Sequence, residues 1–396
     1  MSDKEKKLIY VDNAATTKVS KSVIEAMLPY METYYGNPSS QLYSLGREAK
    51  AALEKARQGV AELLGCDANE IIFTSGGTEA DNWAIKGTAY ATKGRHIITS
   101  KIEHHAILHT LDALIKQGFE VTYLDVYDNG IVRPEDLEKA IREDTILITV
   151  MYANNEIGTI QPIKALAEIA RKHKIPFFTD AVQAVGKLPI NVKELGVDML
   201  SLSGHKIHAP KGIGALYIRK GVRLSNLIEG GGQERGKRSG TENVAGVIAL
   251  EQALREAVAD LTDKDKVGKL RDYLADKLIK IPYSRINGDI KNRLDENLNM
   301  SFEFIEGEGL IMLLDMNGIC ASTGSACSTS SLEPSHVLRA LGLPHEICHG
   351  SLRISLSADN TFEEMDYIAE KVTWAVNRLR MMSPLYERKL KEERSK

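Results

Sequence analysis

The chain has 396 residues, 43% of them hydrophobic and 27% charged, with a formal net charge of −3. This length allows a large core and more than one domain, and the small charge gives no indication of a nucleic-acid or membrane surface. No apolar run approaches the roughly 20 residues of a membrane helix, and the charged start MSDKEKK does not resemble a signal peptide. Four cysteines without a close pair, Cys66, Cys320, Cys327 and Cys348, favour free thiols in a reducing compartment. We therefore expect a cytoplasmic protein.

Strand and helix signals alternate from about residue 46 to residue 219. Apolar spacing predicts a helix over 46–64, which Gly65 ends. Short β-rich runs follow, separated by helical stretches; the strands are expected at 71–75, 96–100, 120–126, 145–152, 175–180 and 198–203, and the helices at 77–90, 106–116, 134–142 and 163–173. This alternation predicts an α/β fold with a mostly parallel sheet covered by helices.

The pattern changes after Arg219. The glycine-rich, basic segment 227–243 predicts a long mobile or interface loop, and helices are expected at about 241–260 and 263–279. The rest mixes strands and helices and predicts a smaller α+β domain. We place the large domain at 16–254 and the small domain at 1–15 and 255–396.

Polar residues follow five of the expected strands, at 74–78, 103–105, 154–155, 180–183 and 203–206. In parallel sheets, ligands bind beyond the carboxyl ends of the strands. Five polar clusters at five strand ends therefore predict one shared site.

Lys206 and Asp180 are the most informative pair. Lys206 ends SLSGHK and Asp180 ends IPFFTD. A lysine in an apolar setting can lose its proton and form a Schiff base, and a carboxylate can hold a pyridine nitrogen protonated, which together suits pyridoxal phosphate (PLP). The simpler alternatives are a surface lysine and a helix-capping aspartate.

A glycine turn precedes the helix at 77–90. Gly76, Gly77 and Thr78 open that helix, and amides at a helix start bind anions. A phosphate site is the functional interpretation and a tight turn is the alternative. Ser203 and His205 are further donors for the same phosphate, and Gln183 is placed to bond a ring hydroxyl.

The run Glu103-His104-His105 suggests a metal site at first sight. Adjacent residues do not face one point, so we predict no metal chelate here and favour one histidine stacked on the cofactor ring. The same argument applies to His205 and His208.

Cys327 lies in ASTGSACSTSS, where every residue is small. A swinging loop and a disordered linker both fit this composition. No apolar stripe is present to bury the thiol, so we predict an exposed, reactive cysteine that narrows the chemistry to sulfur transfer. Arg353, in GSLRISLS, offers a two-pronged donor to a carboxylate, or forms an ordinary ion pair.

Taken together, the motifs resemble cysteine desulfurases of the NifS/IscS type, within the fold-type I PLP enzymes. The resemblance covers nearly the whole chain; it comprises YVDNAATT, YGNPSS, FTSGGTEADN, IITSKIEHHA, ANNEIG, TDAVQAVGK, SLSGHK, RSGTEN, TGSACSTSSLEPSHVLRALG and SLRISL. It implies PLP as cofactor, L-cysteine as substrate, L-alanine as product, and sulfur passed to an Fe–S scaffold protein or another acceptor.

The resemblance also implies roles for single residues. Lys206 matches the lysine that binds PLP, Asp180 the partner of the ring nitrogen, and His104 the stacked histidine, which relays protons. Cys327 matches the persulfide-forming nucleophile, which could transiently ligate an Fe–S cluster. The remaining matches are Gln183 and Asn155 at the ring hydroxyl, Gly77, Thr78, Ser203 and His205 at the phosphate, Thr241 at the phosphate of a second subunit in a homodimer, and Arg353, Asn155, Asn13 and Asn37 at the substrate.

The chain departs from the family pattern at Tyr43, where many relatives carry histidine. Other interpretations are a selenocysteine lyase, an aminotransferase-like enzyme, a PLP-free sulfur carrier or interaction protein, and a metallohydrolase using His104, His105 and Asp180. The Cys327 loop argues against an aminotransferase, which needs no thiol. The presence of Lys206 and Asp180 argues against a PLP-free protein. The lack of metal-ligand spacing argues against a metallohydrolase.

Overall fold

The structure is a computed structural model that describes residues 8–263, 265–323 and 334–395. The predicted nucleophile Cys327 lies outside the described residues. No helix among the described residues is long and apolar enough to cross a membrane.

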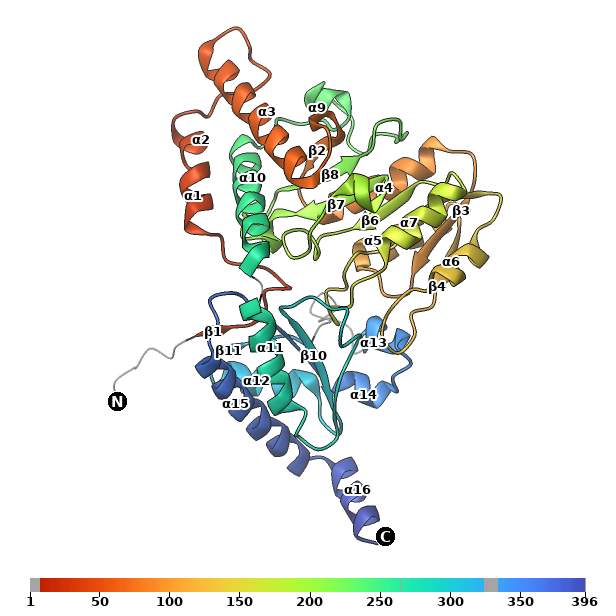
Figure 1. Cartoon of the computed structure of the whole chain (residues 1–396), viewed down its shortest axis with the longest axis vertical. Coiled ribbons are helices and arrows are strands. Elements are labelled where there is room, and N and C mark those ends of the chain that lie inside the picture. Colours follow the sequence, from red (N-terminus) through yellow and green to blue (C-terminus); the bar gives the residue numbers. More distant parts are fainter. Residues whose placement is uncertain (1–7, 264, 324–333, 396) are drawn as a thin grey trace.

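A seven-stranded sheet forms the centre of the larger part of the molecule (Figure 1). The strand order is β2 (Ile71–Thr74), β8 (Gly214–Ile218), β7 (Met199–Ser203), β6 (Phe177–Asp180), β5 (Thr145–Thr149), β3 (His96–Ser100) and β4 (Glu120–Leu124). Strands β7, β6, β5, β3 and β4 pair in parallel, whereas β8 runs antiparallel to both of its neighbours. The predicted mostly parallel sheet is confirmed.

Neighbouring residues of the sheet belong to two different cores. Ile98 and Phe177 pack in one, and Ile97 and Phe178 pack in the other. Successive side chains of a strand point to opposite faces, so both faces need a cover of helices. The first core includes residues of α3 (Ser44–Leu64), α6 (Pro134–Ala140), α7 (Ile163–Lys172) and α10 (Val244–Ala259), and the second includes residues of α4 (Gly77–Ala91) and α5 (His105–Ile115).

A third core lies in the smaller part of the molecule, beneath the sheet in Figure 1. It is built on the antiparallel strands β9 (Ser284–Ile286), β10 (Asn297–Phe302) and β12 (Ser351–Ser355), and on β1 (Ile9–Tyr10), which pairs in parallel with β11 (Ile319–Cys320). The helices α11 (Asp265–Leu278), α12 (Gly307–Asp315) and α15 (Phe362–Met381) cover it. Residues 337–348 pack in the first core instead, and the exact domain boundaries stay a prediction.

The shorter helices join these layers. They are α1 (Lys21–Met27), α2 (Pro29–Glu32), α8 (Val192–Leu195), α9 (Gln233–Gly236), α13 (His336–Ala340), α14 (His345–His349) and α16 (Pro384–Arg394), the last of which projects from the smaller part. The helix predicted over 241–260 begins at Val244, because the side chain of Asn243 caps it by accepting the amide of Gly246 at 3.0 Å.

The segment 227–243 is less free than the mobile loop that its glycines suggested. Glu234 is buried, and the guanidinium of Arg57 donates to both of its carboxylate oxygens, at 2.7 and 2.8 Å. Arg238 forms a second two-pronged pair with Glu79, at 2.8 and 3.0 Å. These contacts anchor the segment to α3 and α4 at two points; mobility of the remaining residues and the interface alternative both stay predictions.

Candidate active site

The predicted site residues gather at one edge of the central sheet. Asp180 ends β6, Ser203 ends β7, and Lys206 closes the short 3-10 helix η2 (Gly204–Lys206) that follows. Strand β2 is antiparallel to β8, and β8 is antiparallel to β7, so β2 runs parallel to β7. Its carboxyl end therefore delivers Gly77, at the start of α4, to the same edge.

Lys206 is half-buried and held by backbone carbonyls. Its Nζ donates to the carbonyl oxygens of Ala14 and Ala15, at 2.6 and 2.7 Å. Gln183 donates through Nε2 to the same oxygen of Ala14 at 2.9 Å. The turn at 12–15 thus holds the amino group at the strand edge, close enough for its charge to favour the ionised form of Asp180 and the neutral form of His104.

Asp180 is a buried carboxylate anchored next to its own strand. Its Oδ1 accepts the amide of Val182 at 2.9 Å. Burial raises the pKa of Asp180 to about 6, although the Val182 amide and the charge of Lys206 act in the opposite direction. A protonated ring nitrogen would give this carboxylate the cationic partner that its burial demands. Behind it, Asp81 accepts the hydroxyl of Ser201 at 2.6 Å, and burial with the charge of Asp180 raises the pKa of Asp81.

His104 caps α5 and faces the same edge. Its Nδ1 accepts the amide of Ala106 at 3.1 Å. Burial and the charge of Lys206 lower the pKa of His104 to about 4, so the ring is neutral at pH 7 and carries its proton on Nε2. Its neighbour His105 turns away toward His109 and His336, with ring centroids 4.8 and 4.9 Å apart. Among the described residues, no group of three or more His, Cys, Asp and Glu could hold a metal ion.

The start of α4 forms a cradle for an anion. Gly76 has φ +150°, and a Cβ added to Gly77 would lie 2.7 Å from Cγ2 of Val182, so both positions favour glycine. The buried Ser203 presents its Oγ 3.6 Å from where a Cβ of Gly76 would be. Thr78 is exposed in the first helical turn. Open backbone amides beside a hydroxyl fit a phosphate group.

His205 lies next to this cradle. Its Nδ1 is 3.1 Å from Oγ1 of Thr16, and its carbonyl accepts the amide of Thr17 at 2.9 Å. Burial, with the charges of Lys206 and Lys211, lowers the pKa of His205 to about 4. A neutral ring contributes a hydrogen bond to a phosphate, not a charge.

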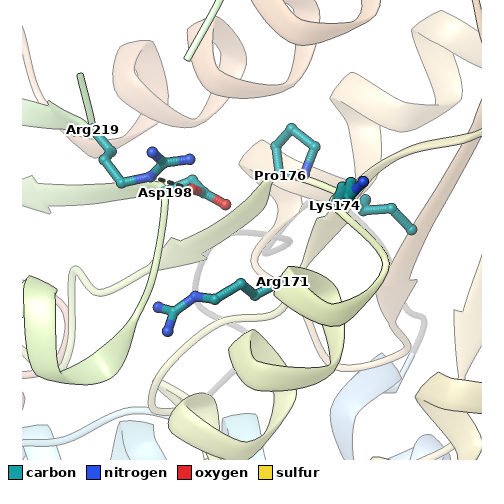
Figure 2. Close-up of a pocket in the computed structure, with 6 residues that line it drawn as sticks. Arg171, Lys174, Pro176, Asp198 and Arg219 are labelled. Atoms are coloured by element: carbon teal, nitrogen blue, oxygen red, sulfur yellow. Dashed lines mark hydrogen bonds and ion pairs between the residues drawn. The ribbon is translucent and has the colours of Figure 1, made fainter. Parts of the chain in front are cut away.

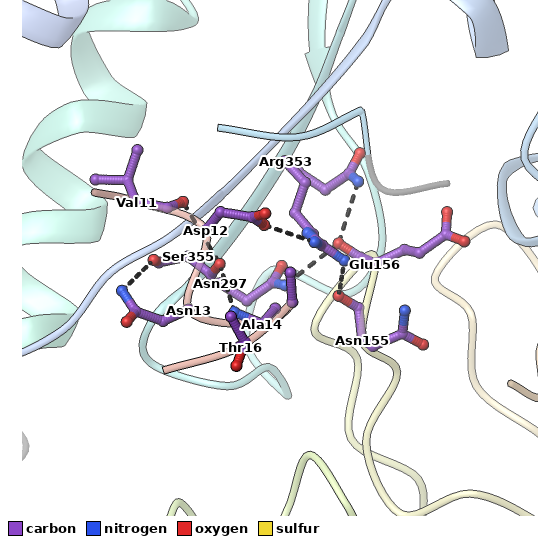
Figure 3. Close-up of polar contacts among 12 residues, drawn as sticks. Val11, Asp12, Asn13, Ala14, Thr16, Asn155, Glu156, Asn297, Arg353 and Ser355 are labelled. Carbon is purple, nitrogen blue, oxygen red and sulfur yellow. Dashed lines mark hydrogen bonds and ion pairs between the residues drawn. The ribbon is translucent and has the colours of Figure 1, made fainter. Parts of the chain in front are cut away.

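Three of the four predicted substrate residues, Arg353, Asn155 and Asn13, meet at a separate point, where β12 approaches the turn at 12–15 (Figure 3). Arg353 is buried and donates to the carboxylate of Asp12 at 2.7 Å and to the carbonyl of Asn155 at 3.1 Å. Asn13 donates through Nδ2 to the carbonyl of Ser355 at 2.9 Å. The turn at 12–15 therefore contacts both the arginine and the lysine.

Two predicted residues, Asn37 and Thr241, are not brought to this edge. Asn37 is exposed between α2 and α3 and accepts the amide of Ser39 at 2.9 Å; among the hydrogen bonds of the described chain, none joins it to Arg353. Thr241 is exposed before α10. Cys327 lies outside the described residues.

Four contributors to the site were not predicted from the sequence. They are the carbonyls of Ala14 and Ala15 and the side chains of Asp12 and Asp81. Asp81 carried a signal, since aspartate is disfavoured inside a helix and needs a reason there. The carbonyls carried none, because a backbone acceptor leaves no mark on residue type.

A cavity of about 460 Å³ lies at the opposite, amino ends of β6 and β7 (Figure 2). Arg171, Lys174, Asp198 and Arg219 line it, and Arg219 pairs with Asp198 at 2.6 Å. None of the predicted site residues lines this cavity, so it is not part of the candidate site.

Comparisons with known proteins agree with this geometry. The model of the aminotransferase class-V family matches residues 9–368. A protein of Methanosarcina thermophila named cysteine desulfurase IscS is 58% identical over 384 residues, which is 96% of this chain and 95% of that protein. The chain belongs to the aminotransferase class-V family, among its cysteine desulfurases.

Solved structures place the chain in the same group. A NifS-like protein superposes with a TM-score of 0.88 at 42% identity, covering 94% of this chain and 100% of that one. A structure titled SspA in complex with cysteine has a TM-score of 0.78 at 39% identity, covering 88% of this chain and 98% of that one. The predicted fold-type I architecture is confirmed, and the chain is an enzyme of this PLP-dependent family.

The residues present fit PLP. The glycine cradle and Ser203 suit the phosphate of PLP, and the buried carboxylate of Asp180 suits its pyridine nitrogen. The amine of Lys206 suits its aldehyde. All three chemical groups lie at one sheet edge, as the strand directions demand.

Proposed function

We propose that this cysteine desulfurase binds PLP at the sheet edge and removes sulfur from L-cysteine, giving L-alanine and a persulfide on Cys327. The relatives' names and the cysteine complex of a structural neighbour support the substrate. The observation that carries the proposal is the turn at 12–15, which binds Lys206 through Ala14 and Arg353 through Asp12. One backbone segment thereby sets the distance between an amine for the cofactor and a cation for the substrate carboxylate.

When bound, PLP supplies an electron sink for the bond broken at the substrate Cα. Asp180 would hold the ring nitrogen protonated, and the neutral His104 would stack on the ring. Gly77, Thr78, Ser203 and His205 would hold the phosphate, and Gln183 and Asn155 the ring hydroxyl. Lys206, once it no longer holds the cofactor, would take the Cα proton.

The substrate would bind through its carboxylate. Arg353 lies on β12 with its side chain 3% exposed, so a carboxylate that reaches it leaves water. A guanidinium binds a carboxylate through two parallel N–H donors, which fixes orientation as well as position. The amino group and Cβ of cysteine would then point to the strand edge that carries Lys206. Asn13, bonded to Ser355, would support this end of the site.

Sulfur transfer needs a thiolate, and the described cysteines suit it poorly. Burial raises the pKa of Cys66 to about 12 and also raises the pKa of Cys320 and Cys348. This supports Cys327 as the nucleophile. Its thiolate would attack the substrate sulfur; an S–S bond forms, the C–S bond breaks, and Cβ takes a proton to give alanine. The persulfide then passes its outer sulfur to an acceptor such as an Fe–S scaffold protein.

A homodimer is part of the proposal. Thr241 is exposed, so its hydroxyl is available to the phosphate of a second subunit. Large apolar side chains are exposed around α1 and α2, which is typical of a surface that another chain covers; they are Ile24, Leu28, Met31, Tyr34, Tyr35, Leu42 and Tyr43.

The test is turnover of the PLP-loaded enzyme with L-cysteine and, separately, with L-selenocysteine. Release of L-alanine from L-cysteine, at a kcat/KM comparable to or higher than that for L-selenocysteine, supports the desulfurase. Turnover confined to selenocysteine would replace the proposal by a selenocysteine lyase. Absence of cofactor absorbance in the purified protein would favour a PLP-free sulfur carrier.

A further inference from the structure

The guanidinium of Arg353 is already engaged before any substrate binds. Its Nη2 donates to Oδ1 of Asp12 at 2.7 Å, and its Nη1 donates to the carbonyl of Asn155 at 3.1 Å (Figure 3). Its Nε is buried and has no hydrogen-bond partner among the described residues. The arginine side chain is 3% exposed and that of Asp12 is 18% exposed, so this pair is shielded from water. An amino acid that approaches Arg353 meets a cation whose charge is already balanced.

The backbone, not the ion pair, brings these two residues together. Asp12 follows β1 and forms an isolated parallel bridge with Ser355, and Ser355 donates its amide to Val11 at 2.7 Å. The carbonyl of Asp12 accepts the amide of Ala15 at 3.0 Å. Asp12 therefore keeps its place without its carboxylate charge. An asparagine there retains the Oδ1 acceptor for Arg353 and removes the charge alone.

We propose that Asp12 competes with the substrate carboxylate for Arg353 and so weakens the binding of every amino acid at this site. This inference rests on the proposed function. With Asp12 ionised, the cluster of arginine, aspartate and bound carboxylate has a net charge of −1; with a neutral residue the same cluster is neutral. Charges shielded from water interact more strongly than exposed ones. The competition weakens the binding of L-alanine and of L-cysteine alike, because both carry the same carboxylate, and so it eases release of the product after turnover.

A purely positioning role for Asp12 gives the opposite outcome. If Asp12 only orients Arg353, its replacement leaves carboxylate affinity unchanged or lowers it, because the arginine loses an anchor and gains nothing. Competition predicts that the affinity rises when the charge is removed. The sign of the change therefore separates the two roles.

The experiment compares the PLP-loaded wild-type enzyme with Asp12→Asn and Asp12→Ser. The dissociation constant of L-alanine is measured at equilibrium from the change in cofactor absorbance, and KM for L-cysteine is measured from alanine release. We expect both constants to fall by about 5- to 10-fold in both variants. This is the range of a modest coupling free energy between two groups, here the Asp12 carboxylate and the amino-acid carboxylate that both bind Arg353. Cysteamine, which has the thiol and amine of cysteine without the carboxylate, should inhibit all three proteins equally.

Glu120→Gln is the matched control. Glu120 lies on β4 and forms an exposed ion pair with Arg142, so the change removes one charge away from the site. It should leave the dissociation constant of L-alanine and the KM for L-cysteine at the wild-type values. An unchanged or raised dissociation constant for L-alanine in a folded Asp12 variant overturns the inference, as does an equal gain for cysteamine. If Asp12→Asn does not fold, Asp12→Ser alone decides. A wild-type enzyme that releases no alanine from cysteine contradicts the proposed function instead, and the equilibrium measurement with alanine still stands.

Discussion

The amino group of Lys206 lies 2.6 Å from the carbonyl oxygen of Ala14, a residue 192 positions earlier in the chain. The same oxygen accepts the side-chain amide of Gln183. A backbone carbonyl cannot be protonated and cannot leave, so it holds the amine in one direction without forming a permanent ion pair with it. The lysine is thereby kept near Asp180 and His104 and remains available to react.

Replacement of Lys206 by alanine should abolish alanine release, a loss of at least about 1,000-fold, because the variant would lack the residue that we propose both anchors the cofactor and takes the Cα proton. The absorbance of the lysine-bound cofactor should disappear as well. The control is Lys193→Ala, which removes an exposed lysine 3.6 Å from Asp67. Normal turnover by the Lys206 variant would remove the lysine from the mechanism.

Asp180→Asn should lower kcat by at least about 100-fold, the scale of losing one preorganised electrostatic partner. The buried carboxylate is the residue that would keep the ring nitrogen protonated, and an amide cannot do so. The measurement is alanine release together with a pH titration of the cofactor absorbance, whose midpoint should shift in the variant. Asp198→Asn, at the opposite end of the sheet and paired with Arg219, provides the control. A variant with the wild-type rate and titration would contradict this role.

His104 should make the cofactor-free protein more stable as pH rises from about 4 to 6.5. Burial lowers its folded-state pKa to about 4, below the ordinary value of 6.5, so on acidification the unfolded chain takes up the proton first. Its contribution is complete above pH 6.5 and is lost as pH falls toward 4. His205 acts in the same direction. As pH is lowered from 6.5 to 4, the denaturant midpoint of unfolding should fall less steeply for His104→Gln than for the wild type.

The comparison for His104→Gln is His345→Gln, which replaces an exposed histidine on α14; it should retain the wild-type slope. Nitrogen NMR of the ring gives an independent readout, since the amide of Ala106 donates to Nδ1. We expect the tautomer with the proton on Nε2. A charged ring at pH 6 would contradict the neutral His104 on which the stacking role depends.

Most secondary structure and the location of the site were predictable because local patterns determine them. Apolar runs such as those ending at Asp180 and Ser203 form buried strands, and parallel strands deliver their carboxyl ends to one edge. The anchored segment around Glu234 was not predictable, because its partner Arg57 lies 177 residues away. The pair of Asp12 and Arg353, 341 residues apart, was missed for the same reason. Local spacing carries no information on such contacts.

Residue type also set a limit on what the sequence alone could establish about the site. A lysine, an aspartate and a glycine turn indicated their own chemistry, whereas the acceptors that orient Lys206 are carbonyls of two alanines. The pKa directions of Asp180, His104 and His205 required burial and neighbouring charges, which follow from the folded chain and not from the motif.

The central claim is that Cys327 takes the sulfur of L-cysteine. The most direct measurement incubates the PLP-loaded enzyme with L-cysteine without added reductant, quantifies L-alanine, and maps bound sulfur by mass spectrometry of the digested protein, with Cys327→Ser alongside. We expect stoichiometric alanine and one added sulfur on the peptide that contains Cys327, with no protein-bound sulfur in the variant. Added sulfur on Cys66, Cys320 or Cys348, or sulfur transfer that persists in Cys327→Ser, would contradict the account.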